Sequence, residues 1–209
     1  MENIDCYYYI NLDHRVDRRE LFEEDFAKMG IPKEKIVRIP GIYKKGFGPY
    51  GCGLSHIKAL ETFLASSHKN CVIFEDDFTF NIDKNYMKYI VKSIFTKLSG
   101  FDVVMFSGNV MKSEPTEYHY LKRVLDAQTA SGFLVTREFA PKILENFKEA
   151  VEMLKAHWEL TGERKHEYCI DISWKILQPK SRWFIVNPKF GYQRESYSDN
   201  EEHVTNYKV

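Results

Sequence analysis

The sequence predicts an α/β protein with a mainly parallel central sheet flanked by helices. Short, β-prone apolar runs alternate with segments of helical period along the first half of the chain. These apolar runs are continuous, as in strands that are buried on both faces. Strands that alternate with helices are typical of parallel βαβ units. The 209 residues, 44% of them hydrophobic, are enough for one substantial core, so we expect a single domain over residues 1–209.

The spacing of apolar residues along the chain locates the expected strands and helices. Residues 6–12 and 35–39 are expected to be strands, separated by a helix at 16–29 whose apolar residues repeat on one face. Gly30 and Pro32 then end that helix. The other expected strands are 71–74, 102–106, 120–124, 133–136 and 183–186, and the other expected helices lie around 57–64, 86–98 and 137–159.

A glycine-rich segment precedes the second helix. Residues 41–53 contain five glycines and no periodicity, which predicts a mobile loop that brings backbone close to a ligand. This loop would deliver Ser55 and His56 to the start of a helix, where free N–H groups, a hydroxyl and an imidazole suit a phosphate. The segment is not a P-loop, because no lysine and Ser/Thr follow in register. The alternative is a core or capping role for both residues.

Three consecutive carboxylates follow a buried strand in VIFEDDF. Glu75, Asp76 and Asp77 come at the strand end, where open α/β sheets bind ligands. Side chains alternate along an extended backbone, so Glu75 and Asp77 are expected to point one way and Asp76 the other. Two carboxylates on one side suit a hard divalent cation that also binds a diphosphate. The alternative is that the acids cap the next turn or pair with lysines.

Basic residues follow the first strand in NLDHRVDRRE. Asn11 and Arg15 stand at the strand end and Arg18 in the first helical turn. The helix dipole disfavours arginine at an N-terminus, so this placement suggests that the arginines meet an anion or stack on a base. The alternative is a solvated helix face on which Asp17 and Glu20 are the partners.

Charge, cysteine spacing and hydropathy limit the partners and the location that can be expected. Thirty basic and thirty acidic residues cancel, so no net field favours nucleic acid. The four cysteines lack ligand spacing and are expected to be buried free thiols. No signal peptide or transmembrane segment is recognisable, so we expect a cytoplasmic location.

Taken together, the motifs resemble glycosyltransferase family 25. The resemblance lies in INLDHRVDRRE, GCGLSH, VIFEDDF, ASGFLVTREFAPKIL and, more loosely, ID followed by YQRESYSDN. These motifs span nearly the whole chain, and their combination is specific although each one is not. The family includes lipooligosaccharide and collagen galactosyltransferases, so the resemblance implies a galactosyltransferase-like enzyme, for example in lipopolysaccharide biosynthesis.

The resemblance implies a GT-A fold with a Rossmann-like nucleotide-binding half, about residues 1–110, and an acceptor-binding half, about 111–209. It implies a DxD-like motif at Glu75 to Asp77 that binds Mn²⁺ or Mg²⁺, with Asp77 and Glu75 as metal ligands. The UDP-sugar donor would contact Asn11, Arg15, Arg18, Ser55, His56, Glu75, Asp76, Gln193, Ser198 and Asp199. The tail sequence SDNEEH departs from the commoner family pattern after these last positions.

The implied reaction is inverting transfer of galactose or glucose from a UDP-hexose to a hydroxyl of a glycan or protein. Asp171 matches the family's ID position and is the candidate general base, with Glu167 and Asp199 as competitors. Two other functions remain open at this point. One is an inactive nucleotide-sugar-binding module. The other is a metal-dependent nucleotidyltransferase or phosphohydrolase, which would need a second acidic cluster that the sequence does not show.

Aromatic residues in the second half could serve the acceptor or the core. A stacking surface for a sugar ring is one interpretation, and core packing is the more common role of such residues. The residues concerned are Trp158, Tyr168, Trp174 and Trp183.

Overall fold

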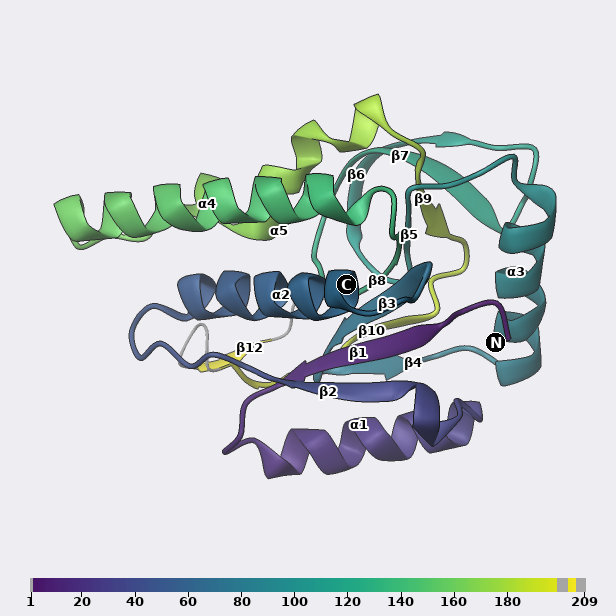
Figure 1. Ribbon diagram of the computed structural model, residues 1–209, viewed down its shortest axis with the longest axis horizontal. Helices are drawn as coiled ribbons and strands as arrows, with labels where there is room; N and C mark the ends of the chain where they lie inside the picture. Colours follow the sequence, from purple (N-terminus) through teal and green to yellow (C-terminus); the bar gives the residue numbers. More distant parts are fainter. Residues whose placement is uncertain (1, 199–202, 206–209) are drawn as a thin grey trace.

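The protein is represented by a computed structural model that describes residues 2–198 and 203–205. Its centre is a sheet whose strands, in chain order, are β1 (Cys6–Asn11), β2 (Ile36–Pro40), β3 (Asn70–Glu75), β5 (Val103–Met105), β6 (Asn109–Pro115), β7 (Leu121–Gln128), β8 (Gly132–Thr136) and β9 (Trp183–Val186). The helices are α1 (Val16–Met29), α2 (Gly48–Ala65), α3 (Lys84–Lys97), α4 (Ala140–Thr161) and the short α5 (Ile170–Ser173). Figure 1 shows these helices arranged around the sheet.

The strands lie in the order β2-β1-β3-β8-β5-β9-β7-β6. Strand β1 is parallel to β2 and β3, and β5 is parallel to β9. Strand β8 is antiparallel to both of its neighbours, and so is β7. The remaining six strands therefore share one direction, which confirms the expected α/β architecture with a mainly parallel sheet.

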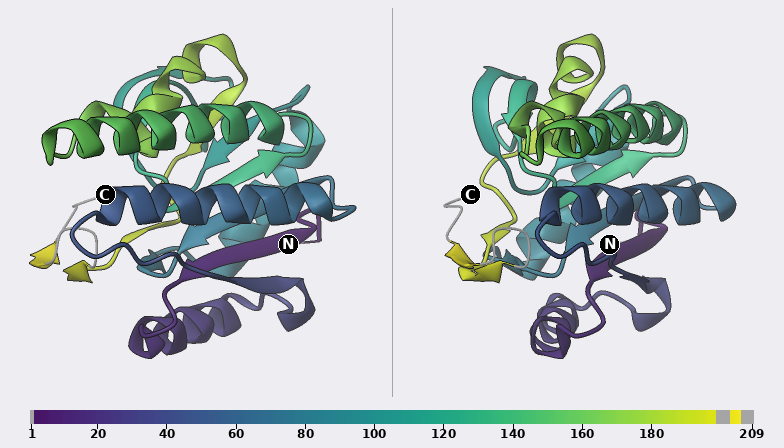
Figure 2. Two further views of the ribbon diagram at one scale, coloured as in Figure 1. Left: turned by 60° about the vertical axis from the view of Figure 1, so that its left-hand side comes forward. Right: turned by 90° about the vertical axis from the view of Figure 1, so that its left-hand side faces the viewer.

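Successive residues of the central strands enter two different cores. In β1, Cys6 and Tyr8 pack on the face that α2 and α4 cover, whereas Tyr7 and Tyr9 pack on the face that α1 and α3 cover. Helices α2 and α4 lie side by side in both views of Figure 2. This alternation is the period of a strand that is buried on both faces. Each large apolar side chain buried in this way contributes about 1.5–3 kcal/mol.

Two of the four aromatic residues noted in the second half belong to the core. Trp174 and Trp183 are fully buried and contact each other edge to face, with 5.1 Å between ring centroids. Trp158 stacks on Phe47 at 4.4 Å and links α4 to the segment that precedes α2. Core packing is therefore the role of Trp174 and Trp183.

Short strands at the carboxyl edge of the sheet were not expected from the sequence. β4 (Phe78–Phe80) pairs antiparallel with β10 (Gly191–Gln193) and brings the tail of the chain beside the acidic segment. β11 (Ser196–Ser198) pairs with β12 (His203–Thr205). Within the described part of the chain, no helix is long and apolar enough to cross a membrane.

The glycine-rich segment is helical from Gly48 onward, which corrects the expected loop over that part, whereas residues 41–47 contain no helix. Helix α2 begins at Gly48, with a proline in its first turn. A Cβ at Gly51 would lie 2.3 Å from the carbonyl oxygen of Ile42, and a Cβ at Gly53 would lie 2.5 Å from Cγ2 of Val151. These glycines therefore serve close packing of the helix against a loop and against α4.

Replacing Gly51 by alanine tests this close approach. The substitution would favour an unconstrained helix by about 1 kcal/mol. Here we expect the opposite sign, a loss of about 1–3 kcal/mol in the free energy of unfolding, because a backbone oxygen cannot move aside as a flexible side chain does. Urea denaturation measures the difference. An increase in unfolding free energy would show that the contact with Ile42 is not limiting.

Candidate active site

The three carboxylates lie at the carboxyl edge of the sheet. Glu75 is the last residue of β3, and Asp76 and Asp77 follow in the turn before β4. Asn11 ends the neighbouring strand β1, and Arg18 lies in the first turn of α1. Ligands of open α/β sheets bind at this edge.

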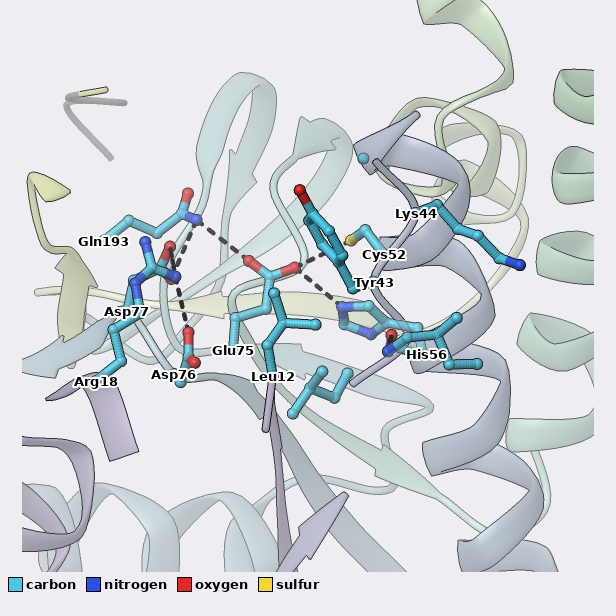
Figure 3. A pocket seen from close by; sticks show the side chains of 14 residues that line it. Leu12, Arg18, Tyr43, Lys44, Cys52, His56, Glu75, Asp76, Asp77 and Gln193 are labelled. Carbon is cyan, nitrogen blue, oxygen red and sulfur yellow. Dashed lines mark hydrogen bonds and ion pairs between the residues drawn. The ribbon is translucent and has the colours of Figure 1, made fainter. Parts of the chain in front are cut away.

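Asp76 is held by two donors from the first strand–helix unit. Its Oδ2 accepts from Nδ2 of Asn11 at 2.7 Å, and its Oδ1 accepts from Nη1 of Arg18 at 2.8 Å. Arg18 also lies 3.5 Å from Oδ2 of Asp77, and Arg38 donates to Oδ1 of Asn11 at 2.9 Å. The anion that Arg18 meets in this structure is thus the acidic cluster itself. Figure 3 shows Arg18 beside Asp76 and Asp77.

Glu75 is held from the other side. Its Oε1 lies 3.0 Å from Nε2 of His56 and 3.5 Å from Sγ of Cys52, and its Oε2 accepts from Nε2 of Gln193 at 3.2 Å. The same amide nitrogen of Gln193 lies 3.4 Å from Oδ1 of Asp77. Gln193 therefore joins Glu75 and Asp77, the two acids expected to share one direction. Figure 3 shows the Glu75 carboxylate between Gln193 and the pair of Cys52 and His56.

The pKa values follow from burial and from this uneven pairing. Burial raises the pKa of Asp77 to about 7; the charge of Glu75 adds to the rise and Arg18 opposes it. Burial also raises the pKa of Asp76, although Arg18 and Asn11 oppose it. At Glu75, burial raises the pKa but the hydrogen bonds from His56 and Cys52 outweigh it, so its pKa lies below the ordinary value.

The charge balance fits a divalent cation between Glu75 and Asp77. In the described part of the chain, Arg18 is the one arginine that pairs with the cluster, through Asp76 and at longer range Asp77, and Asp77 has the poorest compensation. Carboxylate oxygens are the ligands that Mn²⁺ and Mg²⁺ prefer. A cation there would replace the proton that burial otherwise holds on Asp77.

Ser55 and His56 do not lie at a helix start, which corrects the sequence interpretation. Helix α2 begins seven residues before Ser55, at Gly48. The Ser55 hydroxyl accepts from the N–H of Ile42 at 2.8 Å and donates to the carbonyl of Gly51 at 2.7 Å. Its contacts are those of the alternative, a residue that holds backbone in the core. His56 is fully buried and contacts the cluster through Glu75.

Arg15 pairs with Asp17, one of the two acids that the alternative interpretation gave as partners of the arginines. Its Nη2 donates to Oδ2 of Asp17 at 2.8 Å. Ser198 lies in β11, of which the backbone alone is described, and Asp199 lies outside the described residues. The structure therefore places Asn11, Arg18, His56 and Gln193 against the three acids, and Arg15 and Ser55 on other partners.

Two cavities meet at Glu75. The first, of about 90 Å³, is lined by Arg18, Tyr43 and the three acids. The second, of about 410 Å³, is lined by Asn109, Gln128, Thr129 and Asp171 among others. Cys52, Glu75 and Gln193 line both cavities. Figure 3 views the first cavity.

Asp171 lies in the second cavity, in the short helix α5. Its Oδ2 accepts from the N–H of Thr129 at 3.1 Å, and burial raises its pKa. Thr129 has φ 87°, a strained conformation for a β-branched residue. Of the competing bases, Glu167 is exposed and pairs with Lys165 at 3.3 Å, and Asp199 is outside the described residues.

Cys52 and Thr129 contact the candidate catalytic groups but were not selected from the sequence. Cys52 was expected only to be a buried free thiol. It lies four residues before His56, so a helix predicted over both residues would have placed the two side chains on one face. Thr129 acts through its backbone N–H, for which no sequence signal exists.

Comparison with curated proteins finds a relative of low sequence identity. No family model matches the chain. A glycosyltransferase 25 family member of Anopheles gambiae is 23% identical over 165 residues, which cover 66% of this chain and 28% of that protein. The chain is similar to glycosyltransferase family 25. Its matched region spans little more than a quarter of that relative.

Comparison with solved structures supports the type of fold through one likeness with a TM-score above 0.5. A mannose-1-phosphate geranyltransferase from Thermus thermophilus aligns with a TM-score of 0.51 at 12% identity, over 88% of this chain and 73% of that one. A glycosyltransferase involved in glycosylation of the major capsid of PBCV-1 aligns with a TM-score of 0.49 at 14% identity, over 86% and 81% of the two chains. The first likeness agrees with the GT-A-like α/β fold that the sequence motifs imply.

The raised pKa of Asp77 predicts a pH-dependent stability. The folded protein keeps a proton on Asp77 up to a pH of about 7, whereas the unfolded chain releases it near 3.8. Between these values the folded state binds more protons, so the free energy of unfolding falls as pH rises. Without metal, we expect the wild type to lose about 2 kcal/mol more than Asp77→Asn between pH 5 and pH 8.

Urea denaturation in EDTA at both pH values measures this difference. Glu20→Gln, an exposed acid of α1, is the matched control and should follow the wild type. If the wild type and Asp77→Asn lose the same free energy of unfolding between these pH values, the raised pKa does not belong to Asp77.

Proposed function

We propose that this chain is a metal-dependent glycosyltransferase domain that moves a hexose, galactose or glucose, from a UDP-sugar to a hydroxyl of a glycan or protein, with inversion. The observation that carries the proposal is the position of the acidic cluster, with Glu75 at the junction of two cavities. A transferase needs such a junction, because donor and acceptor must meet at one point. The name of the Anopheles gambiae relative supports the same activity.

The first cavity is proposed for the diphosphate end of the donor. Its volume of about 90 Å³ holds an ion and a few ligand atoms rather than a whole nucleotide. Glu75 and Asp77 would hold Mn²⁺ or Mg²⁺, and the metal when bound would neutralise charge on the departing phosphate. Arg18 and Asn11 fix Asp76, which positions the acid pair beside it. Arg15, Ser198 and Asp199 remain in the proposal through the family resemblance alone.

The second cavity is proposed for the acceptor. Its volume of about 410 Å³ suits a sugar ring, and the side chains of Asn109 and Gln128 offer hydrogen bonds to hydroxyl groups. Asp171 would take the proton of the attacking hydroxyl on a carboxylate oxygen. Burial makes this carboxylate more basic than an exposed one, and the Thr129 N–H fixes one of its oxygens.

Release of free UDP from a panel of UDP-sugars tests the donor half of the proposal without knowledge of the acceptor. We expect slow release from one UDP-hexose in Mn²⁺, and loss of that release in EDTA and in Asp77→Ala. Asp126→Ala, which removes an acid of β7 paired with Lys175, is the control. No release and no UDP binding by calorimetry would contradict the proposal and favour an inactive module or another nucleotide class.

Asp171→Asn tests the base. The amide keeps the shape of the side chain and its acceptor oxygen for the Thr129 N–H, but it cannot take a proton. We expect unchanged donor affinity and a transfer rate about 100-fold lower once an acceptor is known. Unchanged turnover would exclude Asp171 as the base.

A further inference from the structure

A second set of potential metal ligands surrounds the inner oxygen of Glu75. Cys52 and His56 lie four residues apart on one face of α2. Sγ of Cys52 and Nε2 of His56 both contact Oε1 of Glu75, at 3.5 Å and 3.0 Å. The three ligand atoms all lie within 4.8 Å of one another. Figure 3 shows them converging from α2 and the end of β3.

The spacing of these atoms is close to that of a tetrahedral zinc site. With Zn–S of about 2.3 Å and Zn–N and Zn–O of about 2.1 Å, tetrahedral angles give roughly 3.6 Å between sulfur and oxygen and roughly 3.4 Å between nitrogen and oxygen. The observed separations are 3.5 Å and 3.0 Å. The histidine and the carboxylate need to separate by a few tenths of an ångström, and the sulfur and nitrogen atoms lie within 4.8 Å of each other.

We propose that Cys52, His56 and Glu75 form a binding site for a thiophilic divalent cation of the Zn²⁺ class. A thiolate, an imidazole and one carboxylate are the ligands of zinc, whereas Mn²⁺ and Mg²⁺ prefer oxygen. This site is distinct from the oxygen site at Glu75 and Asp77, and Glu75 belongs to both. The fourth position would face the cavities that Cys52 and Glu75 line.

Binding requires two proton changes. The Cys52 thiol loses its proton to solvent and becomes a thiolate, and the imidazole turns its Nε2 lone pair to the metal with its proton on Nδ1. Nδ1 of His56 has no hydrogen-bond partner among the described residues. Missing support of this kind lowers metal affinity by about 10–100-fold, so this site binds zinc more weakly than one whose histidine is supported at both nitrogens.

Sharing of Glu75 has a functional consequence, which rests on the proposed function. Zinc on Oε1 draws off the negative charge that Glu75 offers to the oxygen site, and it also places positive charge beside the Mn²⁺ position. Both effects oppose binding of the second cation. Zinc therefore inhibits the transferase in competition with Mn²⁺.

Cobalt spectroscopy tests the site independently of activity. Co²⁺ replaces Zn²⁺ in such sites and gives a thiolate-to-cobalt charge-transfer band and strong visible bands when tetrahedral. We expect these bands in the wild type with one Co²⁺, displaced by Zn²⁺, absent in Cys52→Ser and retained in Cys169→Ser. Cys169 is the matched control because its thiol lines the second cavity but does not belong to the cluster.

Two results of the cobalt experiment would overturn the proposal. One is absence of the bands in the wild type, and the other is their persistence in Cys52→Ser. His56→Gln provides a second variant, and it should weaken Zn²⁺ binding by at least about 10-fold in calorimetry. Asp77→Asn should keep the cobalt bands, because Asp77 belongs only to the oxygen site.

Inhibition is measured separately, as the Zn²⁺ concentration that halves UDP release at several Mn²⁺ concentrations. We expect this concentration to rise with Mn²⁺ in the wild type and to be at least about 10-fold higher in Cys52→Ser, each variant being compared with its own zinc-free rate. If the wild type releases no UDP, the proposed function fails while the cobalt bands still decide the metal site. If UDP release is normal and Zn²⁺ has no effect, the competition is excluded.

Discussion

Among the described residues, one arginine, Arg18, pairs with the cluster of Glu75, Asp76 and Asp77, and the arrangement around the cluster depends on this excess of negative charge. A buried carboxylate without donors costs several kcal/mol. Asp76 receives donors from Asn11 and Arg18, and Glu75 receives them from both sides. Among the described residues, the Asp77 carboxylate receives only long contacts, from Arg18 at 3.5 Å and from Gln193 at 3.4 Å. The cost is thus concentrated on one carboxylate, which is the condition that favours binding of a cation there.

The antiparallel strand β8 connects this charge to the second half of the chain. Because β8 runs against β3, the segment that enters β8 lies beside the end of β3. The carbonyl of Ser131 accepts from the N–H of Glu75 at 2.9 Å, and two residues earlier the N–H of Thr129 donates to Asp171 at 3.1 Å. A parallel strand in the same place would put its entry loop at the opposite edge of the sheet. The reversal therefore fixes the candidate base relative to the acids through backbone hydrogen bonds.

Most of the regular elements could be predicted from the sequence because both-face burial leaves a strong local pattern. The apolar runs at β1, β3 and β9 and the stripe of α1 lie where their periods place them. The start of α2 could not be predicted in this way, since glycine disfavours a free helix and only contact with Ile42 and Val151 explains Gly51 and Gly53. The short strands β4, β6 and β10 have too few residues, or too polar a pattern, to show a period.

The candidate site was predictable to a different degree. The acids and Arg18 lie close to a strand end in the sequence, so local reasoning finds them. Gln193 contacts Glu75 across a separation of 118 residues, and no local pattern connects them, so only the family resemblance selected it. Cys52 escaped because a single cysteine carries no signal, and its spacing from His56 has meaning only once both residues are placed on one helix. Because the predicted helix began too late, the sequence interpretation placed Ser55 and His56 at a helix start and did not select Cys52.

The position of Glu75 determines how the two cavities communicate. His56 fixes one of its oxygens and Gln193 the other, so the carboxylate cannot swing freely from one cavity to the other. Moving Oε1 away would leave Nε2 of the buried His56 without its partner, at a cost of about 1–3 kcal/mol. Charge, in contrast, acts across the junction without any movement, because both cavities share this carboxylate as a wall and burial weakens solvent screening. Binding of a cation on one side of Glu75 therefore changes the affinity of the other side through electrostatics rather than through a conformational switch.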